Sequence, residues 1–188
     1  VNIENAVAAV ATLWCAARRE ARPLDGERLR EAMASFEGVK RRFEFYVNTP
    51  RQVYMDDYAH HPRELAAALS SLRGMFPGRR ITAIFQPHLY TRTRDFYKDF
   101  ADSLSLLDEV ILVDIYPARE QPIPGVSSRL IYDNLRPGIE KSMCKKEEIL
   151  DVLKAKHIEV LITLGAGDID NYVPGICDLL SRRMVPSD

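Results

Sequence analysis

The order of hydrophobic and polar residues predicts that the chain opens with two helices. From residue 2 to residue 19, apolar side chains recur at intervals of three and four, and neither Gly nor Pro interrupts them. This spacing is typical of an amphipathic helix. Pro23 breaks the pattern, and Asp25 is a suitable N-cap for a second, shorter helix that ends before Gly38. We expect these two helices to form a small unit of their own.

The rest of the chain alternates between short apolar runs and longer stretches of helical periodicity. Runs such as Ile111-Leu112-Val113 and Val160-Leu161-Ile162 are continuous rather than alternating, which is typical of strands covered by helices on both faces. The predicted strands cover about 43–47, 53–55, 81–85, 110–114, 139–143 and 160–164, and the predicted helices cover about 62–75, 93–106, 127–135, 145–156 and 169–182. The pattern predicts an α/β fold with a doubly wound, mostly parallel, Rossmann-like sheet. Its helices lie on both faces, and a small helical segment precedes it. We place the domain boundary between residues 1–40 and 41–188.

Composition limits the classes of function. Hydrophobic residues make up 46% and charged residues 28% of the 188 residues, as in ordinary globular proteins. The formal net charge is only -1, with both signs mixed along the chain, so we expect no nucleic-acid partner. The three cysteines lie far apart without metal-binding spacing, which favours reduced thiols in a cytoplasmic protein.

No apolar run is long enough for a membrane span, and the first residues lack the features of a signal peptide. We therefore expect neither a membrane partner nor secretion. The chain begins without Met, inside a predicted helix. We expect it to be a segment of a longer protein.

Polar residues follow four of the predicted strands. The four segments are Asp56-Asp57-Tyr58-Ala59-His60-His61-Pro62, Gln86-Pro87-His88-Leu89-Tyr90-Thr91-Arg92, Asp114-Ile115-Tyr116-Pro117-Ala118-Arg119-Glu120 and Gly165-Ala166-Gly167-Asp168. Ligands of doubly wound sheets bind at the carboxyl ends of the strands. We therefore expect these four loops to face one crevice.

The acidic and histidine cluster that ends in His61 has two readings. Asp57 or His60 can cap the helix that Pro62 opens. Alternatively, the cluster supplies donors for a metal-dependent hydrolase. Adjacent residues of an extended segment point in opposite directions, however, so at most one Asp and one His can share an ion without ligands from elsewhere. Only His88 and Asp114 are available at other strand ends.

Two further loops carry possible ligand contacts. Arg92 lies near the start of a predicted helix, where it suits a carboxylate or a phosphate. In the last loop we expect the glycines to allow a tight turn and Asp168 to cap the final helix. The chain contains no G-x-x-x-x-G-K-[ST] loop, so the phosphates of any nucleotide must be bound elsewhere.

Several of these motifs, in this order, resemble the Mur ligase family of peptidoglycan synthesis. The resemblance rests on Asp57-Tyr58-Ala59-His60-His61-Pro62, Phe85-Gln86-Pro87-His88, Tyr90-Thr91-Arg92-Thr93 and Tyr116-Pro117-Ala118-Arg119-Glu120, and covers essentially the whole chain. It is nearest to the members that join L-alanine to UDP-N-acetylmuramate with ATP and Mg2+, through an acyl phosphate. It implies a carboxyl-terminal domain that follows the last helices of the central ATPase domain. The phosphate loop and metal ligands would then lie in other domains of the same enzyme, and this piece alone would be inactive.

The resemblance also implies roles for individual residues. It implies cofactor contacts by Asn2, Asn5, Arg42 and Asp57, with Arg41 as the alternative to Arg42. It implies substrate contacts by Tyr58, His60, His88 and Arg92. Catalytic roles are expected for Asp57, His60 and His88, and none of these residues is expected to bind a metal ion. Leu89 stands where the family usually has Arg. This leaves Arg92 to bind an anion alone or with Arg94.

Three rival functions are kept open. A recycling Mur ligase, which joins a whole peptide to the same muramate, shares the Asp-Asp-x-Ala-His-His-Pro segment but lacks the run from Phe85 to Arg92. A free-standing binding domain and the metal-dependent hydrolase are the other two.

Overall fold

The computed structural model describes residues 2–36 and 38–182, without the side chains of residues 2–4. The chain divides into two compact units, Val1–Val39 and Lys40–Asp188. Within the described residues, no helix combines the length and the apolar character needed to cross a membrane.

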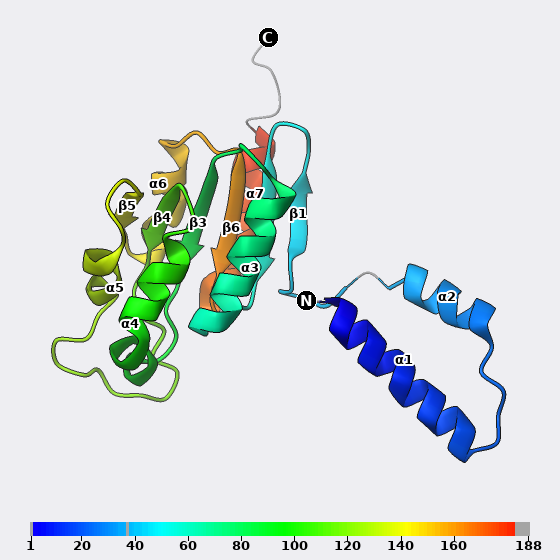
Figure 1. The fold of residues 1–188 in the computed structure, drawn as a ribbon. Helices are drawn as coiled ribbons and strands as arrows, with labels where there is room; N and C mark the ends of the chain where they lie inside the picture. The colour runs from blue at the N-terminus through cyan, green and yellow to red at the C-terminus, as the bar shows by residue number, and fades with distance from the viewer. Residues whose placement is uncertain (1, 37, 183–188) are drawn as a thin grey trace, which may run out of the picture. The chain divides into compact units, whose positions relative to one another are not determined.

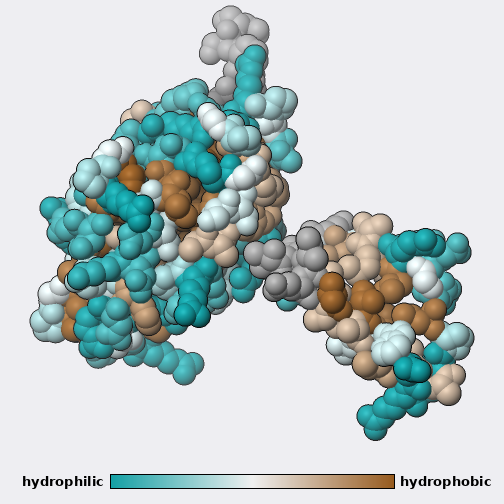
Figure 2. All heavy atoms as spheres, in the orientation of Figure 1, coloured by the Kyte–Doolittle hydropathy of each residue, from teal (hydrophilic) through white to brown (hydrophobic). Residues whose placement is uncertain are grey.

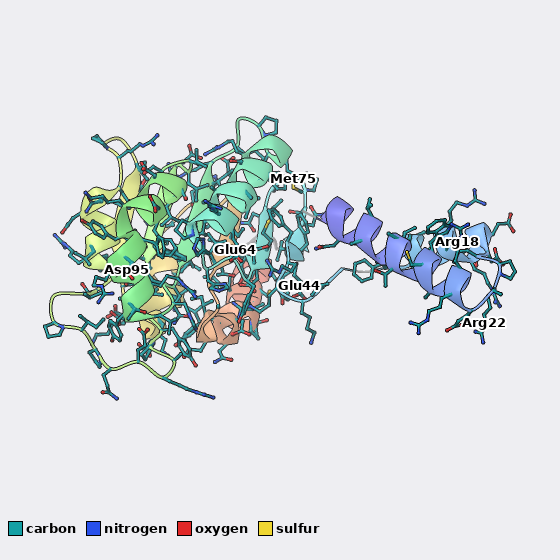
Figure 3. All side chains as sticks on the ribbon, turned by 60° about the horizontal axis from the view of Figure 1, so that its bottom comes forward. Arg18, Arg22, Glu44, Glu64, Met75 and Asp95 are labelled. Atoms are coloured by element: carbon teal, nitrogen blue, oxygen red, sulfur yellow. The ribbon has the colours of Figure 1, made fainter. Side chains whose placement is uncertain are left out.

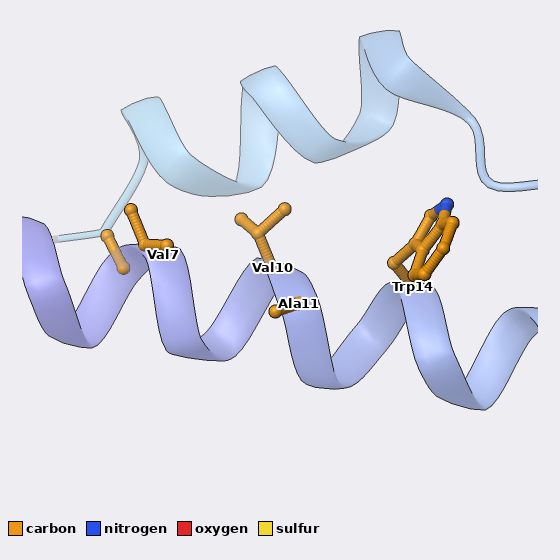
Figure 4. Close-up of a pocket in the computed structure, with 5 residues that line it drawn as sticks. Val7, Val10, Ala11 and Trp14 are labelled. Atoms are coloured by element: carbon orange, nitrogen blue, oxygen red, sulfur yellow. The ribbon is translucent and has the colours of Figure 1, made fainter.

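The first unit contains α1 (Asn2–Arg19) and α2 (Gly26–Ala34). As predicted, Asp25 caps α2, because its carboxylate accepts hydrogen bonds from the backbone amides of Glu27 at 2.9 Å and Arg28 at 3.2 Å. One side of α1 carries apolar side chains around a hollow, including Val7, Val10 and Trp14 (Figure 4). Val7 and Trp14 are exposed in this unit.

The second unit is built on one six-stranded sheet with the order β1-β2-β6-β3-β4-β5. Its strands are β1 (Glu44–Asn48), β2 (Val53–Asp57), β3 (Ile81–Phe85), β4 (Glu109–Leu112), β5 (Glu140–Met143) and β6 (Val160–Leu164). Only the edge strand β1 runs antiparallel, to β2, and the other pairs are parallel. The mostly parallel α/β sheet of the prediction is confirmed (Figure 1).

Helices cover both faces of this sheet, as the continuous apolar strands predicted (Figure 1). The described helices are α3 (Pro62–Met75), α4 (Tyr90–Leu104), α5 (Arg129–Asn134), α6 (Ile149–Lys154) and α7 (Val173–Arg182), with short 3-10 helices η1 (Lys146–Glu148) and η2 (Asp168–Tyr172). The hydrophobic core between α3, α4, α5 and one face includes Leu69 and Phe100. The core between α6, α7 and the other face includes Leu153 and Ile176. On the face drawn in Figure 2, hydrophilic side chains cover much of this unit.

Several element bounds differ from the predictions for identifiable reasons. The fourth helix begins at Tyr90 rather than Thr93, because the Glu120 carboxylate accepts a hydrogen bond from the Thr91 amide in its first turn. The last helix begins at Val173, and the preceding residues form η2. Pro174 then lies in the first turn, where its missing N–H leaves no helical hydrogen bond unmade.

Candidate functional site

Four loops meet at the carboxyl edge of the parallel strands, as expected. The Gly165 amide donates to the Asp57 carbonyl at 3.3 Å, which joins the ends of β6 and β2. The Gln86 amide donates to the Leu164 carbonyl at 3.0 Å, which joins the ends of β3 and β6. The loop after β4 is tied to the loop after β3 by the hydrogen bond from the Tyr116 amide to the Pro87 carbonyl, at 2.8 Å. The four loops therefore form a single edge.

Four aromatic rings lie in series along this edge. The ring centroids of Tyr58 and His60 are 5.2 Å apart, those of His60 and His88 are 5.8 Å apart, and those of His88 and Tyr116 are 5.6 Å apart. The Arg92 guanidinium donates to the His60 carbonyl at 3.4 Å. The four predicted substrate residues thus lie together. Tyr116 joins them, and only its place in a strand-end motif pointed to it.

The surroundings of His88 favour its neutral form. Burial lowers the pKa of His88 below its usual range, and the positive charge of Arg92, with that of His60 when it is protonated, adds to this effect against the opposing charge of Glu120. Its Nδ1 atom is buried and finds no hydrogen-bond partner among the described residues. A neutral imidazole with an unused nitrogen can accept or donate one hydrogen bond to a bound molecule.

His60 is oriented by its own loop. Its Nδ1 lies 3.0 Å from the Tyr58 carbonyl oxygen and 3.3 Å from a Glu64 carboxylate oxygen. Burial alone would raise the pKa of Glu64, but hydrogen bonds from the backbone amides of His60 and His61, together with the charge of His60, lower it. With acceptors facing Nδ1, a neutral ring would carry its proton there and leave Nε2 as the accepting atom. Figure 3 labels Glu64 in the second unit.

The prediction that Asp57 or His60 caps α3 is wrong, because His61 occupies the cap. The His61 side chain accepts from the Arg63 amide at 3.4 Å, and Glu64 reaches back to the His61 amide at 3.3 Å. This reciprocal arrangement is a capping box. Since it uses the residue directly before Pro62, Asp57 and His60 are left for other contacts.

Asp57 is an anchor between two loops. Its side chain is buried, with 3% exposure, and accepts hydrogen bonds from the Phe43 amide at 2.9 Å and the Ala59 amide at 2.8 Å. Burial raises the pKa of Asp57, and these two hydrogen bonds oppose that shift. Asp57 therefore fixes the segment after Arg42 against the loop that carries Tyr58 and His60.

Arg41 and Arg42 have opposite environments. The Arg41 side chain is mostly buried. Its guanidinium donates to Asp56, Gly165 and Gly167 and lies 3.6 Å from an Asp170 carboxylate oxygen. Arg42 is exposed. Both guanidinium groups lie over the Tyr58 ring, 5.1 Å from its centroid for Arg41 and 6.0 Å for Arg42. Of the pair, Arg42 is the one available to a ligand.

The acidic and histidine cluster does not form a metal centre. Asp56 is fully buried and bound to Thr163 at 2.6 Å, whereas His61 faces the Phe96 ring at a centroid distance of 5.2 Å. Within residues 2–36 and 38–182, no three His, Cys, Asp or Glu side chains are grouped so that they could hold a metal ion. The structure thus gives the hydrolase reading no support.

The loop after β6 is fixed by packing. A Cβ atom on Gly167 would lie 2.3 Å from the Gln86 side-chain oxygen and 2.6 Å from the Tyr116 ring, and Gly165 has φ +138°. Both positions therefore require glycine. The prediction that Asp168 caps the last helix is wrong: its carboxylate accepts from the Gln86 amide group at 2.7 Å and pairs with Lys146.

Glu120 occupies the amino terminus of α4, a contact that the sequence did not reveal. Its carboxylate accepts from both the amide and the hydroxyl of Thr91, with a distance of 3.0 Å to the amide nitrogen. These hydrogen bonds lower the pKa of Glu120. Leu89, in the N-cap position, makes no side-chain cap, so Glu120 replaces a local cap from a loop far along the chain.

Comparison with known proteins agrees with this arrangement. The sequence model of the family described as Mur ligase, glutamate ligase domain, matches residues 41–169. The chain belongs to the Mur ligase family. The matched range includes every loop of the carboxyl edge, so the Mur ligase domain and the candidate site coincide.

Its relatives include enzymes named UDP-N-acetylmuramate–L-alanine ligase. The protein of that name from Phocaeicola vulgatus is 66% identical over 97% of this chain, and the one from Parabacteroides distasonis is 53% identical over 98%. A crystal structure of the UDP-N-acetylmuramate-alanine ligase from Thermotoga maritima superimposes with a TM-score of 0.76, at 27% identity over 97% of this chain. A murein peptide ligase from Psychrobacter arcticus shares the fold with a TM-score of 0.66 at 18% identity.

This Mur ligase chain spans about two fifths of the length of the relatives it matches, 39% and 38% for the first two. Of the residues on α1 for which the family resemblance implies cofactor contacts, Asn5 is exposed. The side chain of Asn2 lies outside the described residues. Their roles stay predictions.

Proposed function

We propose that this chain is the carboxyl-terminal part of an ATP-dependent ligase that joins L-alanine to UDP-N-acetylmuramate in peptidoglycan synthesis. The observation that carries the proposal is the row of Tyr58, His60 and His88 beside Arg92 at the carboxyl edge of a Mur ligase domain. The 66% identity to a protein of that name supports this choice of substrates. The other domains of the same enzyme complete the site.

In this proposal the chain binds and orients the two molecules that are joined. Arg92 offers a positive charge to a carboxylate, and neutral His88 offers an uncharged hydrogen-bonding group next to it. His60 presents Nε2 as an acceptor, because its Nδ1 faces the Tyr58 carbonyl and Glu64. An acceptor of this kind suits the ammonium group of L-alanine, which must lose a proton before its nitrogen can attack a carbonyl carbon. We assign catalytic roles to His60 and His88 on this basis.

Arg42 and Asp57 form the cofactor-binding part of the proposal. ATP supplies the phosphoryl group that activates the muramate carboxylate, so that an acyl phosphate precedes the amide. The exposed Arg42 guanidinium fits a polyphosphate by charge. Asp57 holds the Phe43 amide, directly after Arg42, and thereby orders the segment that carries this arginine. Direct contact of Asp57 with ATP, and its place among the catalytic residues, stay predictions.

Among the described residues, no three His, Cys, Asp or Glu side chains are grouped so that they could hold a metal ion. The proposal places the metal ligands and the phosphate loop in the other domains. In this proposal the loops at the carboxyl edge position the substrates and supply charge, and phosphoryl and acyl transfer depend chiefly on these two effects.

The proposal is tested with the full-length enzyme that contains this chain. Purified enzyme is incubated with ATP, Mg2+ and UDP-N-acetylmuramate, and phosphate release is followed with L-alanine or with an L-alanyl peptide as the second substrate. We expect phosphate release and a new amide product with L-alanine, and little with the peptide. A preference for the peptide would identify a recycling ligase instead. No ATP-dependent release with either substrate would refute the ligase function.

A further inference from the structure

Arg41 is mostly buried and Arg42 is exposed, which suggests that the two arginines have different roles. We propose that Arg41 is a positioning residue: its guanidinium locks the Gly165–Asp168 turn to the end of β2 and fixes the segment that presents Arg42 at the mouth of the site. The nucleotide contact of Arg42 rests on the proposed function. The positioning role of Arg41 rests on the structure alone.

The Arg41 side chain uses all three guanidinium nitrogens. Nε donates to an Asp56 carboxylate oxygen at 2.8 Å, Nη2 to the Gly165 carbonyl at 2.6 Å and Nη1 to the Gly167 carbonyl at 3.2 Å. Its side chain is 14% exposed. These three acceptors lie on two elements, and an Asp170 carboxylate oxygen lies 3.6 Å from Nη1. A guanidinium can donate to separate acceptors from three nitrogen atoms, whereas a lysine ammonium has only one nitrogen. Arg41 thus connects the end of β2 with the turn after β6.

The partner of Arg41 is itself fixed. Asp56 has no exposed surface, and its second carboxylate oxygen accepts from the Thr163 hydroxyl at 2.6 Å. The Tyr54 hydroxyl lies 3.2 Å from the same Thr163 hydroxyl. A continuous buried chain of polar groups therefore runs from the interior of the sheet to Arg41. Such networks hold one arrangement when every member has its partner.

The backbone around Arg42 provides independent support. Arg41 and Phe43, on either side of it, have φ values of 58° and 50°. This left-handed region is unfavourable for residues with a side chain and persists where the surroundings enforce it. Here the Arg41 carbonyl accepts from the Tyr58 amide at 2.6 Å, and the Phe43 amide donates to Asp57 at 2.9 Å. The strained turn is anchored on both sides of the arginine it presents.

Hydrogen exchange on the 188-residue chain tests the proposal without reference to catalysis. In R41K and R41A we expect the amides of Phe43, Tyr58 and Gly165 to exchange at least about tenfold faster, because their acceptors lose their fixed positions. Amides within β3 should keep their rates. The matched control is R129K, since Arg129 is an exposed arginine on α5 that pairs with Asp133 at 2.9 Å.

Guanidinium rescue distinguishes positioning from general stabilisation. R41A leaves a site lined by the carboxylates of Asp56 and Asp170 and the carbonyls of Gly165 and Gly167. Guanidinium chloride at low, non-denaturing concentration should slow exchange of the three amides in R41A, and sodium chloride at the same ionic strength should not. Equal effects of the two salts would overturn the proposal. The proposal would also be overturned if the three amides exchanged at the parent rate in R41K and R41A, or if the exchange rates in β3 increased equally.

A kinetic measurement on the full-length enzyme tests whether the positioning by Arg41 affects ATP binding by Arg42. We expect R41K and R42A both to raise the KM for ATP, whereas R41K alone changes the exchange pattern. An unaltered KM for ATP in R41K, with the exchange pattern changed, would refute the link between positioning and Arg42. If the parent enzyme shows no ligation at all, the proposed function fails, and the exchange and rescue results still decide the role of Arg41.

Discussion

The charge on His88 depends on its neighbours, which makes it a sensitive reporter of the site. Burial and the nearby Arg92 lower the pKa of His88. We predict that NMR titration of the chain finds this pKa below the ordinary value of 6.5, and that R92Q raises it. A His88 pKa that is the same in the parent and in R92Q would contradict the electrostatic account.

The same shift has a consequence for stability. A histidine whose pKa is lowered by folding binds its proton more tightly in the unfolded chain, so its charging favours unfolding. The chain should therefore lose stability as the pH falls through 6.5, and H88N should reduce that loss. Urea unfolding at a series of pH values measures the slope.

Adding a single Cβ atom at Gly167 tests how tightly the loop after β6 is packed. Because that atom would lie 2.3 Å from the Gln86 side chain, we predict that G167A destabilises the chain by about 1–3 kcal/mol. The control is G74A on α3, where a Cβ atom meets nothing within 4 Å and should stabilise by a few tenths to about 1 kcal/mol. Equal midpoints of urea unfolding for the two variants would count against the packing argument.

The sequence could identify residues but not all of their partners. The position of their loops after parallel strands predicted that Tyr58, His60, His88 and Arg92 lie at one edge of the sheet, whereas their substrate roles came from the family resemblance. Tyr116 was named only as part of a motif, since ring packing depends on the path of a loop. Asp168 was assigned to a helix cap because nothing in the sequence indicates that Gln86 and Lys146 reach it.

Among the elements, α4 shows how a distant loop can decide where a helix begins. Leu89 provides no cap, and the Glu120 carboxylate binds the Thr91 amide in its place. We predict that E120A frays the start of α4 and speeds hydrogen exchange at Thr91, with little change at the end of the helix. E120D, which shortens the reach, should give an intermediate effect. An exchange rate at Thr91 equal to that of the parent would contradict this role.

Element positions were predicted best where the apolar pattern is strongest. The bounds of α3, β3 and β6 match the predicted ranges, because Pro62 marks one start and buried strands are continuous apolar runs. The helices after residues 145 and 169 begin instead with 3-10 turns. Such turns depend on local hydrogen bonding, which the spacing of hydrophobic residues does not indicate.

For the molecule as a whole, two compact units imply separable folding. The second unit contains both hydrophobic cores, whereas Val7, Trp14 and Phe36 of the first unit are exposed. We predict that a chain of residues 40–188 unfolds cooperatively, with a thermal midpoint close to that of the 188-residue chain. Loss of cooperative unfolding in circular dichroism would show that the second unit depends on the first.

The proposed function requires that Arg92, at the carboxyl edge of this Mur ligase domain, binds a carboxylate of a substrate. Arg92 and Arg94 lie on the same helix, but Arg92 contacts the His60 carbonyl while Arg94 is exposed and pairs with Asp95. The most direct measurement is kcat/KM for L-alanine in the full-length enzyme carrying R92A or R94A. We predict a loss of about 100-fold for R92A, or roughly 3 kcal/mol at the transition state, and a change of less than about twofold for R94A. Equal activities of the two variants would contradict the claim.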